Sequence, residues 1–110
     1  MDSYLIFSTY LNECNRSYDL SHAEIFLLDF VALKLSSGNV VHVKDLIKHK
    51  EVASQATLHK ALKNLINKNL LKLNYVNNDG RLKSVLLTNL ASERFRGLNR
   101  AIRKASANPK

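Results

Sequence analysis

Residues 54–70 read SQATLHKALKNLINKNL. The apolar side chains of this stretch recur at every third or fourth position, which is the spacing of one face of a helix. They are Leu58, Ala61, Leu62, Leu65 and Ile66. Ser54 stands just before this run, where its hydroxyl can accept a hydrogen bond from an amide of the first helical turn. The sequence therefore predicts a capped, amphipathic helix over residues 54–68.

The face of this helix that lies opposite the apolar stripe is polar and cationic. At about 100° per residue it carries Ala56, Lys60, Lys63 and Asn67, flanked by Thr57, His59 and Asn64. The helix contains no carboxylate side chain that would repel a polyanion. We interpret this face as a surface that enters a groove of DNA.

Positive charge is concentrated outside the first third of the chain. Residues 1–33 hold one Arg and five Asp or Glu, a net charge of −4, whereas residues 34–110 hold 16 Lys or Arg and four Asp or Glu, a net charge of +12. Such a basic excess attracts polyanions and favours nucleic acid over a membrane surface. A solvated basic face without a partner is the plainer interpretation.

Length and composition suit one compact domain with a modest core, since the chain has 110 residues of which 45% are hydrophobic. A single cysteine, Cys14, excludes an intramolecular disulfide and favours a reducing compartment. The N-terminus lacks the pattern of a signal peptide, and Asp29 interrupts the longest apolar stretch well short of a membrane span. We therefore expect a cytoplasmic protein with no membrane partner.

Two helices are expected ahead of residue 43. In the first, Tyr4, Phe7, Leu11 and Cys14 step by 3, 4 and 3 positions, which predicts a helix over residues 3–14. Ser21-His22-Ala23-Glu24 has the pattern of a capping box and opens a helix over residues 22–36. That second helix is apolar nearly all round, which is typical of a helix at the centre of a domain.

The middle of the chain has the pattern of a helix-turn-helix followed by a β-hairpin. Residues 43–49 return to helical spacing, and residues 50–53 connect them to the helix that begins at Ser54. Residues 71–75 alternate with period two, as a half-buried strand does. The turn signal Asn77-Asn78-Asp79-Gly80 then leads into a return strand over residues 81–88. We expect these two strands to form a wing, with Arg81 and Lys83 beside its tip.

A last helix is predicted over residues 89–106, capped by Thr88 or Asn89. Its apolar positions form a heptad-like seam, and its arginines, including Arg94, are expected on other faces. The seam consists of Ala91, Phe95, Leu98, Ile102 and Ala105. The predicted fold class is mainly α with a small β-wing (α+β), a winged helix-turn-helix in a single domain, 1–110, in which residues 43–88 supply the helix-turn-helix and the wing.

The order of these elements resembles that of the winged helix-turn-helix regulators of the multiple-antibiotic-resistance regulator (MarR) type. The likeness runs from about Val43 to Phe95 and is carried by four motifs. They are Ser54-Gln55-Ala56-Thr57-Leu58, the leucines Leu62, Leu65, Leu70 and Leu71, Asp79-Gly80-Arg81, and Leu87-Thr88. The resemblance implies that Asp79 helps to place Arg81 at a minor groove. It also implies that the terminal helices, residues 1–16 and 89–106, form a dimer.

Two positions depart from the pattern of that family. Asn69 stands where a Gly is usual after the recognition helix, and Asn89-Leu90-Ala91 replaces a polar-Gly ending. The chain also has room for only one C-terminal helix, so the dimer module is reduced. PadR-like and staphylococcal-accessory-regulator-like arrangements therefore stay open.

The residues expected to contact DNA lie on the recognition helix and the wing. Lys60 and Lys63 are candidates for phosphate or base-edge contacts, and Arg81 for a narrow minor groove. The full set is Ser54, Gln55, Ala56, Thr57, His59, Lys60, Lys63, Asn64, Arg81 and Lys83. The apolar seams of the terminal helices give a candidate dimer interface of Tyr4, Phe7, Leu11, Phe95, Leu98 and Ile102.

The sequence offers no basis for catalysis, a cofactor or a metal site. Its four histidines lack metal-ligand spacing, its carboxylates are scattered singly, and its three glycines stand alone. Cys14 is a candidate redox switch by resemblance, but a packed or idle thiol is the plainer interpretation because neighbouring Glu13 does not favour a thiolate.

We therefore expect a transcriptional regulator, not an enzyme, that binds double-stranded DNA sequence-specifically as a homodimer on an inverted-repeat site. One alternative is a winged-helix module that binds an acidic protein. Another is a replication or partition factor of a mobile element. A single-strand binder is disfavoured because the basic segment shows no exposed aromatic platform. The operator, the direction of regulation and any small-molecule effector are not encoded in a form that sequence patterns reveal.

Overall fold

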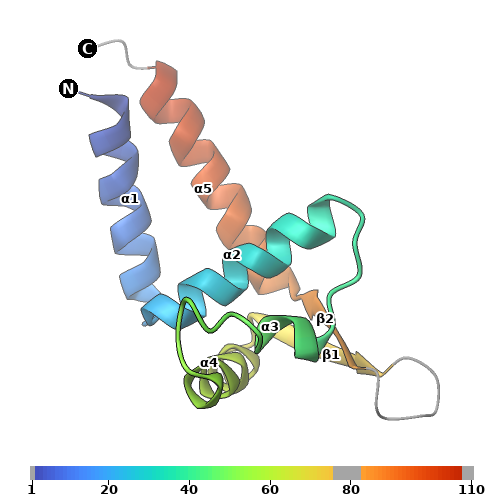
Figure 1. Cartoon of the computed structure of the whole chain (residues 1–110). Coiled ribbons are helices and arrows are strands. Elements are labelled where there is room, and N and C mark those ends of the chain that lie inside the picture. Colours follow the sequence, from blue (N-terminus) through green and yellow to red (C-terminus); the bar gives the residue numbers. More distant parts are fainter. Residues whose placement is uncertain (1, 76–82, 108–110) are drawn as a thin grey trace.

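The computed structural model describes residues 2–75 and 83–107, and Figure 1 shows how they are arranged. The helices are α1 (Ser3–Ser17), α2 (His22–Ser36), α3 (Val43–Leu46), α4 (Gln55–Asn67) and α5 (Asn89–Ala107), and the strands are β1 (Leu71–Tyr75) and β2 (Lys83–Leu87). Helices α1 and α5 lie side by side in opposite directions and extend away from a body formed by the other elements. The predicted mainly α fold with a small β-wing is confirmed.

Serine side chains start α2 and α4 as the sequence predicted. Ser21 Oγ accepts a hydrogen bond from the Glu24 amide at 3.2 Å, and the Glu24 carboxylate reaches back to the Ser21 amide, which completes the capping box. Ser54 Oγ accepts from the Thr57 amide at 3.1 Å. Both contacts satisfy amides that the first helical turn leaves without a partner.

Thr88, and not Asn89, caps α5. Its Oγ1 accepts a hydrogen bond from the Ala91 amide at 3.1 Å. The same hydroxyl donates to the carbonyl of Asn69 at 2.6 Å. The start of α5 is therefore fixed directly to the chain that leaves α4.

Helices α1, α2 and α4 are each followed, two residues after their last helical residue, by a residue in the left-handed conformation. These residues are Asp19 (φ 54°), Gly38 (φ 81°) and Asn69 (φ 61°). At the end of α4 the Asn69 amide donates to Ile66 O at 3.0 Å and the Leu70 amide to Leu65 O at 2.9 Å, the pattern of a Schellman motif. Asn and Asp are the side chains that tolerate this conformation best after Gly. Asn69 thus adopts the left-handed conformation for which a glycine is usual at this position.

The hydrophobic core lies between α2, α4 and the two strands. Its fully buried side chains include Leu27, Leu28 and Val31 of α2, Leu58 and Leu65 of α4, and Leu70, Leu71 and Val85 beside or within the strands. Helix α2 packs against both α4 and β2. The helix predicted over residues 22–36 therefore contributes to the centre of the fold, but its buried residues form one stripe and Leu33 is 66% exposed, so it is not buried all round.

The two strands pair antiparallel, in a register that runs from Leu71↔Leu87 to Tyr75↔Lys83. A third segment joins them, since the Val85 amide donates to Val41 O at 2.8 Å and His42 forms an isolated bridge with Ser84. The predicted turn at residues 77–80 and the predicted wing residue Arg81 lie outside the described residues.

Helix α3 is shorter than predicted. It is a single turn, Val43–Leu46, and residues 47–53 run through turns and a bend in place of the helix expected to continue to 49. The ring of His49 packs edge-on against Phe26 and Phe30 of α2, with centroids 5.0 and 4.6 Å apart. This packing draws the chain toward α2 before another helical turn can form, and residue spacing alone could not reveal it.

The buried stripe of α5 also differs from the predicted seam. Its buried residues are Ala91, Arg94, Ala101 and Ala105, whereas Ile102 is 45% exposed. The assignment of Arg94 to an outer face is therefore wrong. Alanines on the inner stripe let α1 approach α5 closely, because the separation of two packed helices depends on the side chains between them.

Candidate nucleic-acid interface

Helix α4 buries one face and exposes the other. Leu58, Leu62 and Leu65 are buried in the core. The side chains exposed on the other face are Gln55, Ala56, Thr57, His59, Lys60, Lys63 and Asn67. The predicted division of this helix into an apolar and a cationic face is confirmed.

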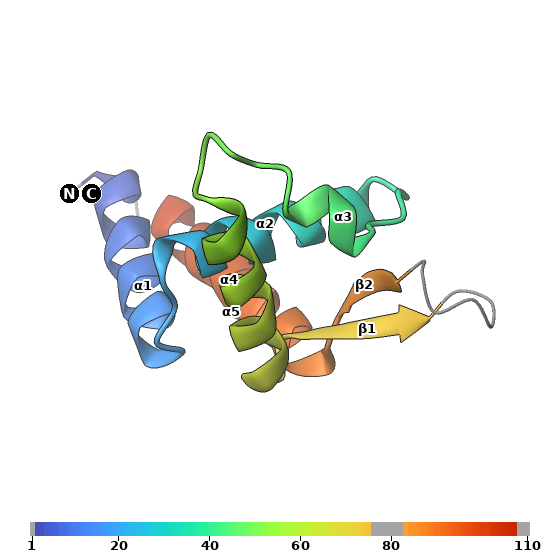
Figure 2. The ribbon, with the colours of Figure 1, turned by 60° about the horizontal axis from the view of Figure 1, so that its bottom comes forward.

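A hollow of about 420 Å³ separates the exposed face of α4 from the wing. His59, Lys60 and Lys63 of α4 line one side of it, and Lys83 of β2 lines the other. Apolar side chains supply the rest of the lining, namely Val43, Leu62, Ile66 and Leu73. Figure 2 shows α4 and β1 next to each other on this side of the molecule. Three lysines from two separate elements thus surround one depression.

The first turn of α4 is held rigid by two hydroxyls. Ser54 Oγ accepts from the Thr57 amide and donates to Thr57 Oγ1 at 2.9 Å. These two predicted DNA contacts therefore also serve as the helix cap. Beside them, Gln55 and Ala56 are exposed at the N-terminal end of α4, where a helix that enters a groove reaches base edges.

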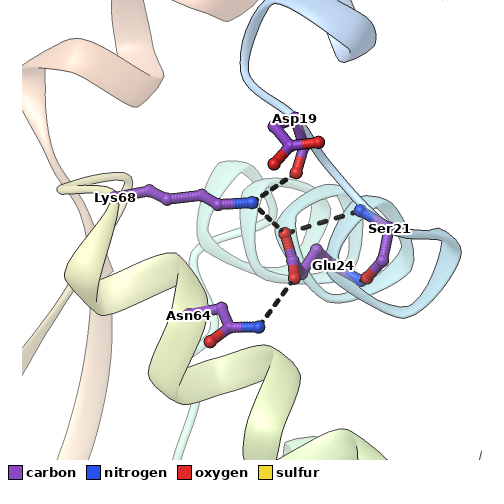
Figure 3. Close-up of polar contacts among 5 residues, drawn as sticks. All are labelled: Asp19, Ser21, Glu24, Asn64 and Lys68. Carbon is purple, nitrogen blue, oxygen red and sulfur yellow. Dashed lines mark hydrogen bonds and ion pairs between the residues drawn. The ribbon is translucent and has the colours of Figure 1, made fainter.

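Asn64 lies apart from the exposed set, although sequence analysis included it among the DNA contacts. Its side-chain amide donates to Glu24 Oε2 of α2 at 3.0 Å, so the group faces the protein and not the outer surface of α4 (Figure 3). The partner residues are 40 positions apart in the chain. We correct its role to that of a contact between helices.

The carboxylate of Glu24 is the centre of a buried polar cluster (Figure 3). Its Oε1 accepts from Lys68 Nζ at 2.6 Å, and Lys68 Nζ also donates to the carbonyl of Asp19. Burial by itself would raise the pKa of Glu24, but the hydrogen bonds from Lys68 and Asn64 and the charge of Lys68 outweigh it and lower that pKa. The group is therefore a carboxylate in the folded protein, and sequence analysis identified it only as a helix cap.

Comparison with solved structures identifies the architecture. A crystal structure of the S. aureus MepR–DNA complex is similar with a TM-score of 0.72 and 15% identity, over 90% of this chain and 77% of that one. A MarR-like transcriptional regulator from Thermotoga maritima is similar over 100% of this chain and 84% of its own, with a TM-score of 0.62 and 19% identity. A MarR-family regulator from Silicibacter pomeroyi covers 91% of this chain and 64% of its own, with a TM-score of 0.59 and 22% identity. No protein-family model and no curated protein matches the sequence. The fold is the winged helix of MarR-type regulators.

In this winged-helix fold, α4 is the second helix of the helix-turn-helix and the strand pair is the wing. Tyr75 and Lys83 are paired across the strands, and Lys83 Nζ lies 5.5 Å from the centroid of the Tyr75 ring. Tyr75 is 57% exposed and shares its strand face with Leu73, because side chains alternate along a strand. Tyr75 was not among the predicted site residues, although the period-two pattern of residues 71–75 was a signal for it. Its exposure also differs from the expectation that the basic segment shows no exposed aromatic platform.

The candidate dimer residues differ in exposure within a single winged-helix chain. Tyr4 and Ile102 are exposed, whereas Phe7, Leu11 and Leu98 are half-buried. Phe95 packs against the core and also lines a hollow between α2 and α5. All of α1 is described and none of its residues is buried, while Tyr4, Leu5 and Tyr10 are exposed. Helix α1 therefore carries apolar side chains that the described residues leave uncovered.

Arg94 joins the terminal helices of this winged helix to its body. Its Nη2 donates to Asn15 Oδ1 of α1, and its Nη1 lies 4.0 Å from Asp29 Oδ1 of α2. Within residues 2–75 and 83–107, its Nε and Nη1 have no hydrogen-bond partner. A buried guanidinium with incomplete hydrogen bonding joins three helices at an electrostatic cost.

The part of the chain that the structure describes holds neither a metal-binding cluster nor a membrane-spanning helix. There, no three His, Cys, Asp or Glu side chains gather in a way that could hold a metal ion. No helix among these residues combines the length and apolar character needed to cross a membrane. Cys14 is a half-buried free thiol on α1.

Proposed function

We propose that this protein is a transcriptional regulator that binds double-stranded DNA, with α4 in a major groove and the wing over the adjacent backbone and minor groove. One observation carries the proposal. Lys60 and Lys63 of α4 and Lys83 of β2 line the same hollow on the exposed side of the molecule. The neighbour MepR, which was crystallised with DNA, supports the proposal by its similar fold.

A single exposed helix with lysines on its outer face suits a groove of duplex DNA. A major groove is about 12 Å wide and admits one α-helix, whose flanks then face the two phosphate backbones. Lysines on the exposed face of α4 and on the wing would neutralise phosphates and release their counterions. His59 lines the same hollow and would contact the backbone there.

Sequence readout would come from the N-terminal end of α4. Gln55 and Ala56 are exposed there. A glutamine can pair bidentately with adenine, and an alanine methyl can contact the methyl group of thymine. Ser54 would hold this end in place, and the Thr57 hydroxyl, which accepts from Ser54, would donate to phosphate. Asn64 is left out of the proposed interface because its amide is bonded to Glu24.

A homodimer on an inverted-repeat site is the second part of the proposal. The support is the exposed apolar side chains of Tyr4 and Leu5 on α1 and of Ile102 on α5. A two-fold dimer formed through α1 and α5 would present two copies of α4. Two recognition helices about 34 Å apart meet successive major grooves on one side of the duplex.

The deciding experiment compares two charge-matched double variants. Lys60→Glu/Lys63→Glu should abolish binding to genomic fragments that the wild type selects. Lys34→Glu/Lys104→Glu changes the net charge equally at exposed positions outside α4 and the wing, and should keep most of the affinity. Affinities are measured by fluorescence anisotropy at fixed salt. Equal affinity of the first variant and the wild type would favour the protein-interaction alternative, and an equal loss in both variants would indicate attraction without a defined interface.

A further inference from the structure

The C-terminal end of α4 is the point at which four segments of the chain meet. Lys68 Nζ donates both to the Glu24 carboxylate at the start of α2 and to the carbonyl of Asp19 after α1 (Figure 3). The next residue, Asn69, accepts at its carbonyl from Thr88 Oγ1 at the start of α5. Both helices of the α1–α5 pair are thus bonded to the end of the proposed recognition helix.

We propose that Glu24 is a positioning residue for DNA recognition, which acts through Asn64 and Lys68 to fix the rotation of α4 about its own axis. The inference rests on the DNA-binding function proposed above. It assigns to a buried carboxylate outside the DNA-facing surface a role in the specificity of that surface.

The two oxygens of Glu24 act on different turns of α4. Oε2 accepts from Asn64 at 3.0 Å and Oε1 from Lys68 at 2.6 Å. Residues four positions apart lie above one another on a helix face, so two such contacts restrain rotation as well as distance. The apolar contacts of Leu58, Leu62 and Leu65 are non-directional and restrain rotation less.

The carboxylate itself has little freedom to move. The Glu24 side chain is 5% exposed, and its backbone is fixed by the capping box with Ser21. A rotation of α4 would therefore break at least one of its two hydrogen bonds. Such directional, charge-assisted bonds give geometric specificity that apolar packing does not.

A small rotation of α4 would matter on its opposite face. The surface of a helix lies about 5 Å from its axis, so a turn of about 20° moves an outer side chain by about 2 Å. Contacts to base edges need placement to within roughly 0.5 Å. Phosphate contacts by long lysine side chains tolerate such a shift. Loss of the Glu24 contacts should therefore reduce specific binding and spare non-specific binding.

The test measures two affinities for each variant. One duplex is a fragment that the wild type selects from genomic DNA, and the other is an unrelated duplex of equal length. Asn64→Ala and Glu24→Ala should lower the affinity for the selected duplex by about tenfold, the discrimination carried by one good base contact, and leave the affinity for the unrelated duplex unchanged. Circular dichroism at the assay temperature shows whether each variant is folded.

Two further variants keep the outcome interpretable. Glu24→Gln should retain most of the specificity ratio, which is the affinity for the selected duplex divided by that for the unrelated one. The Gln side-chain oxygen can accept from Lys68, and its amide can donate to the Asn64 oxygen once the Asn64 amide is turned over. Asn12→Ala removes an exposed asparagine of α1 and should behave as the wild type. If Glu24→Ala does not fold, Asn64→Ala decides, since it removes only one hydrogen bond.

The possible results separate this inference from the proposed function. A wild type that binds neither duplex overturns both. A wild type that binds DNA, with Asn64→Ala variants that keep the full specificity ratio or lose both affinities equally, overturns the positioning role alone. A lower ratio in Glu24→Gln equal to that of Glu24→Ala would also contradict it, because hydrogen bonding without charge would then not suffice.

Discussion

Lys68 Nζ lies 2.6 Å from Glu24 Oε1 and bonds the end of α4 to the start of α2. The pair has a consequence for acid stability. Burial opposes ionisation of Glu24, but the hydrogen bonds and charge around it lower its pKa below the ordinary value of 4.5. A carboxyl group whose pKa is lower in the folded than in the unfolded state stabilises the fold above the unfolded pKa, and this contribution is lost as the pH falls through the folded pKa.

Glu24→Gln should therefore remove part of the pH dependence of stability. At pH 6–7 we expect the variant to be less stable than the wild type by about 1 kcal/mol, the difference between a hydrogen bond to a charged group and one to a neutral group. The difference should shrink once the pH falls below 4.5. Urea unfolding at several pH values measures it. A difference that stays constant from pH 7 to pH 3 would mean that the Glu24 charge does not stabilise the fold.

Truncation of the buried stripe of α4 should destabilise the protein strongly. Leu65 is fully buried, so Leu65→Ala removes apolar contacts and leaves a cavity, at a cost of about 2–5 kcal/mol. Leu33→Ala is the matched control, because Leu33 is 66% exposed and its truncation should change stability by less than about 0.5 kcal/mol. Both are measured by chemical unfolding at a protein concentration where the chain is monomeric. Similar losses in the two variants would contradict the described core.

The left-handed conformation of Asn69 predicts opposite effects of one substitution at two positions. Asn69→Ala should destabilise the protein by about 1 kcal/mol, because alanine adopts a positive φ at a cost that asparagine reduces. Asn12→Ala should instead stabilise it by a few tenths of a kcal/mol, because Asn12 lies within α1, where alanine has the higher helix propensity. Thermal unfolding of both variants tests this. Equal effects would be incompatible with the described end of α4.

The wing should contribute to DNA affinity through charge. Lys83→Ala should weaken binding to all duplexes and reduce the slope of log affinity against log salt by about one per protomer. Tyr75→Ala removes the ring over which Lys83 lies and should weaken binding less, without a change of slope. Titrations between 50 and 200 mM salt distinguish the two. An unchanged slope for Lys83→Ala would remove the wing strand from the proposed interface.

The open apolar surface of α1 should control assembly. Tyr4→Asp/Leu5→Asp places two charges on exposed positions and should convert a dimer into a monomer at micromolar concentration. Val40→Asp is the control, since Val40 is 64% exposed in the loop after α2. Light scattering gives the mass of each. A monomeric wild type, or a dimer that survives the double substitution, would contradict assembly through α1.

Local sequence rules predicted the elements that depend on local chemistry. The capping box at Ser21 and the cap at Ser54 set the start of α2 and α4, and the apolar stripe of Leu58, Leu62 and Leu65 identified the buried face. Lys60 and Lys63 are exposed for the same reason, since a helix that buries one stripe must present the opposite one. These features follow from neighbours within a few residues.

Long-range contacts account for what the sequence did not reveal. The Asn64–Glu24 bond joins residues 40 positions apart, and no periodicity links them. Helical spacing allowed two adjacent stripes of α5 to be the buried one. Hydrophobicity favoured the stripe that contains Ile102, whereas the structure buries the stripe that contains Arg94. The stripe with Arg94 is the buried one because its guanidinium lies close to Asn15 of α1 and Asp29 of α2. These two partners come near Arg94 only in the packed structure.

Helix α1 has no buried residue and packs mainly on α5. Few buried contacts mean a low free energy of local opening, so its amides should exchange with deuterium well before those of α2, which is at the centre of the core. A second copy that covers α1 would slow the exchange of its amides. The protection of the amides of residues 3–17 from deuterium exchange therefore shows whether the protein has assembled, without a fluorescent label or DNA.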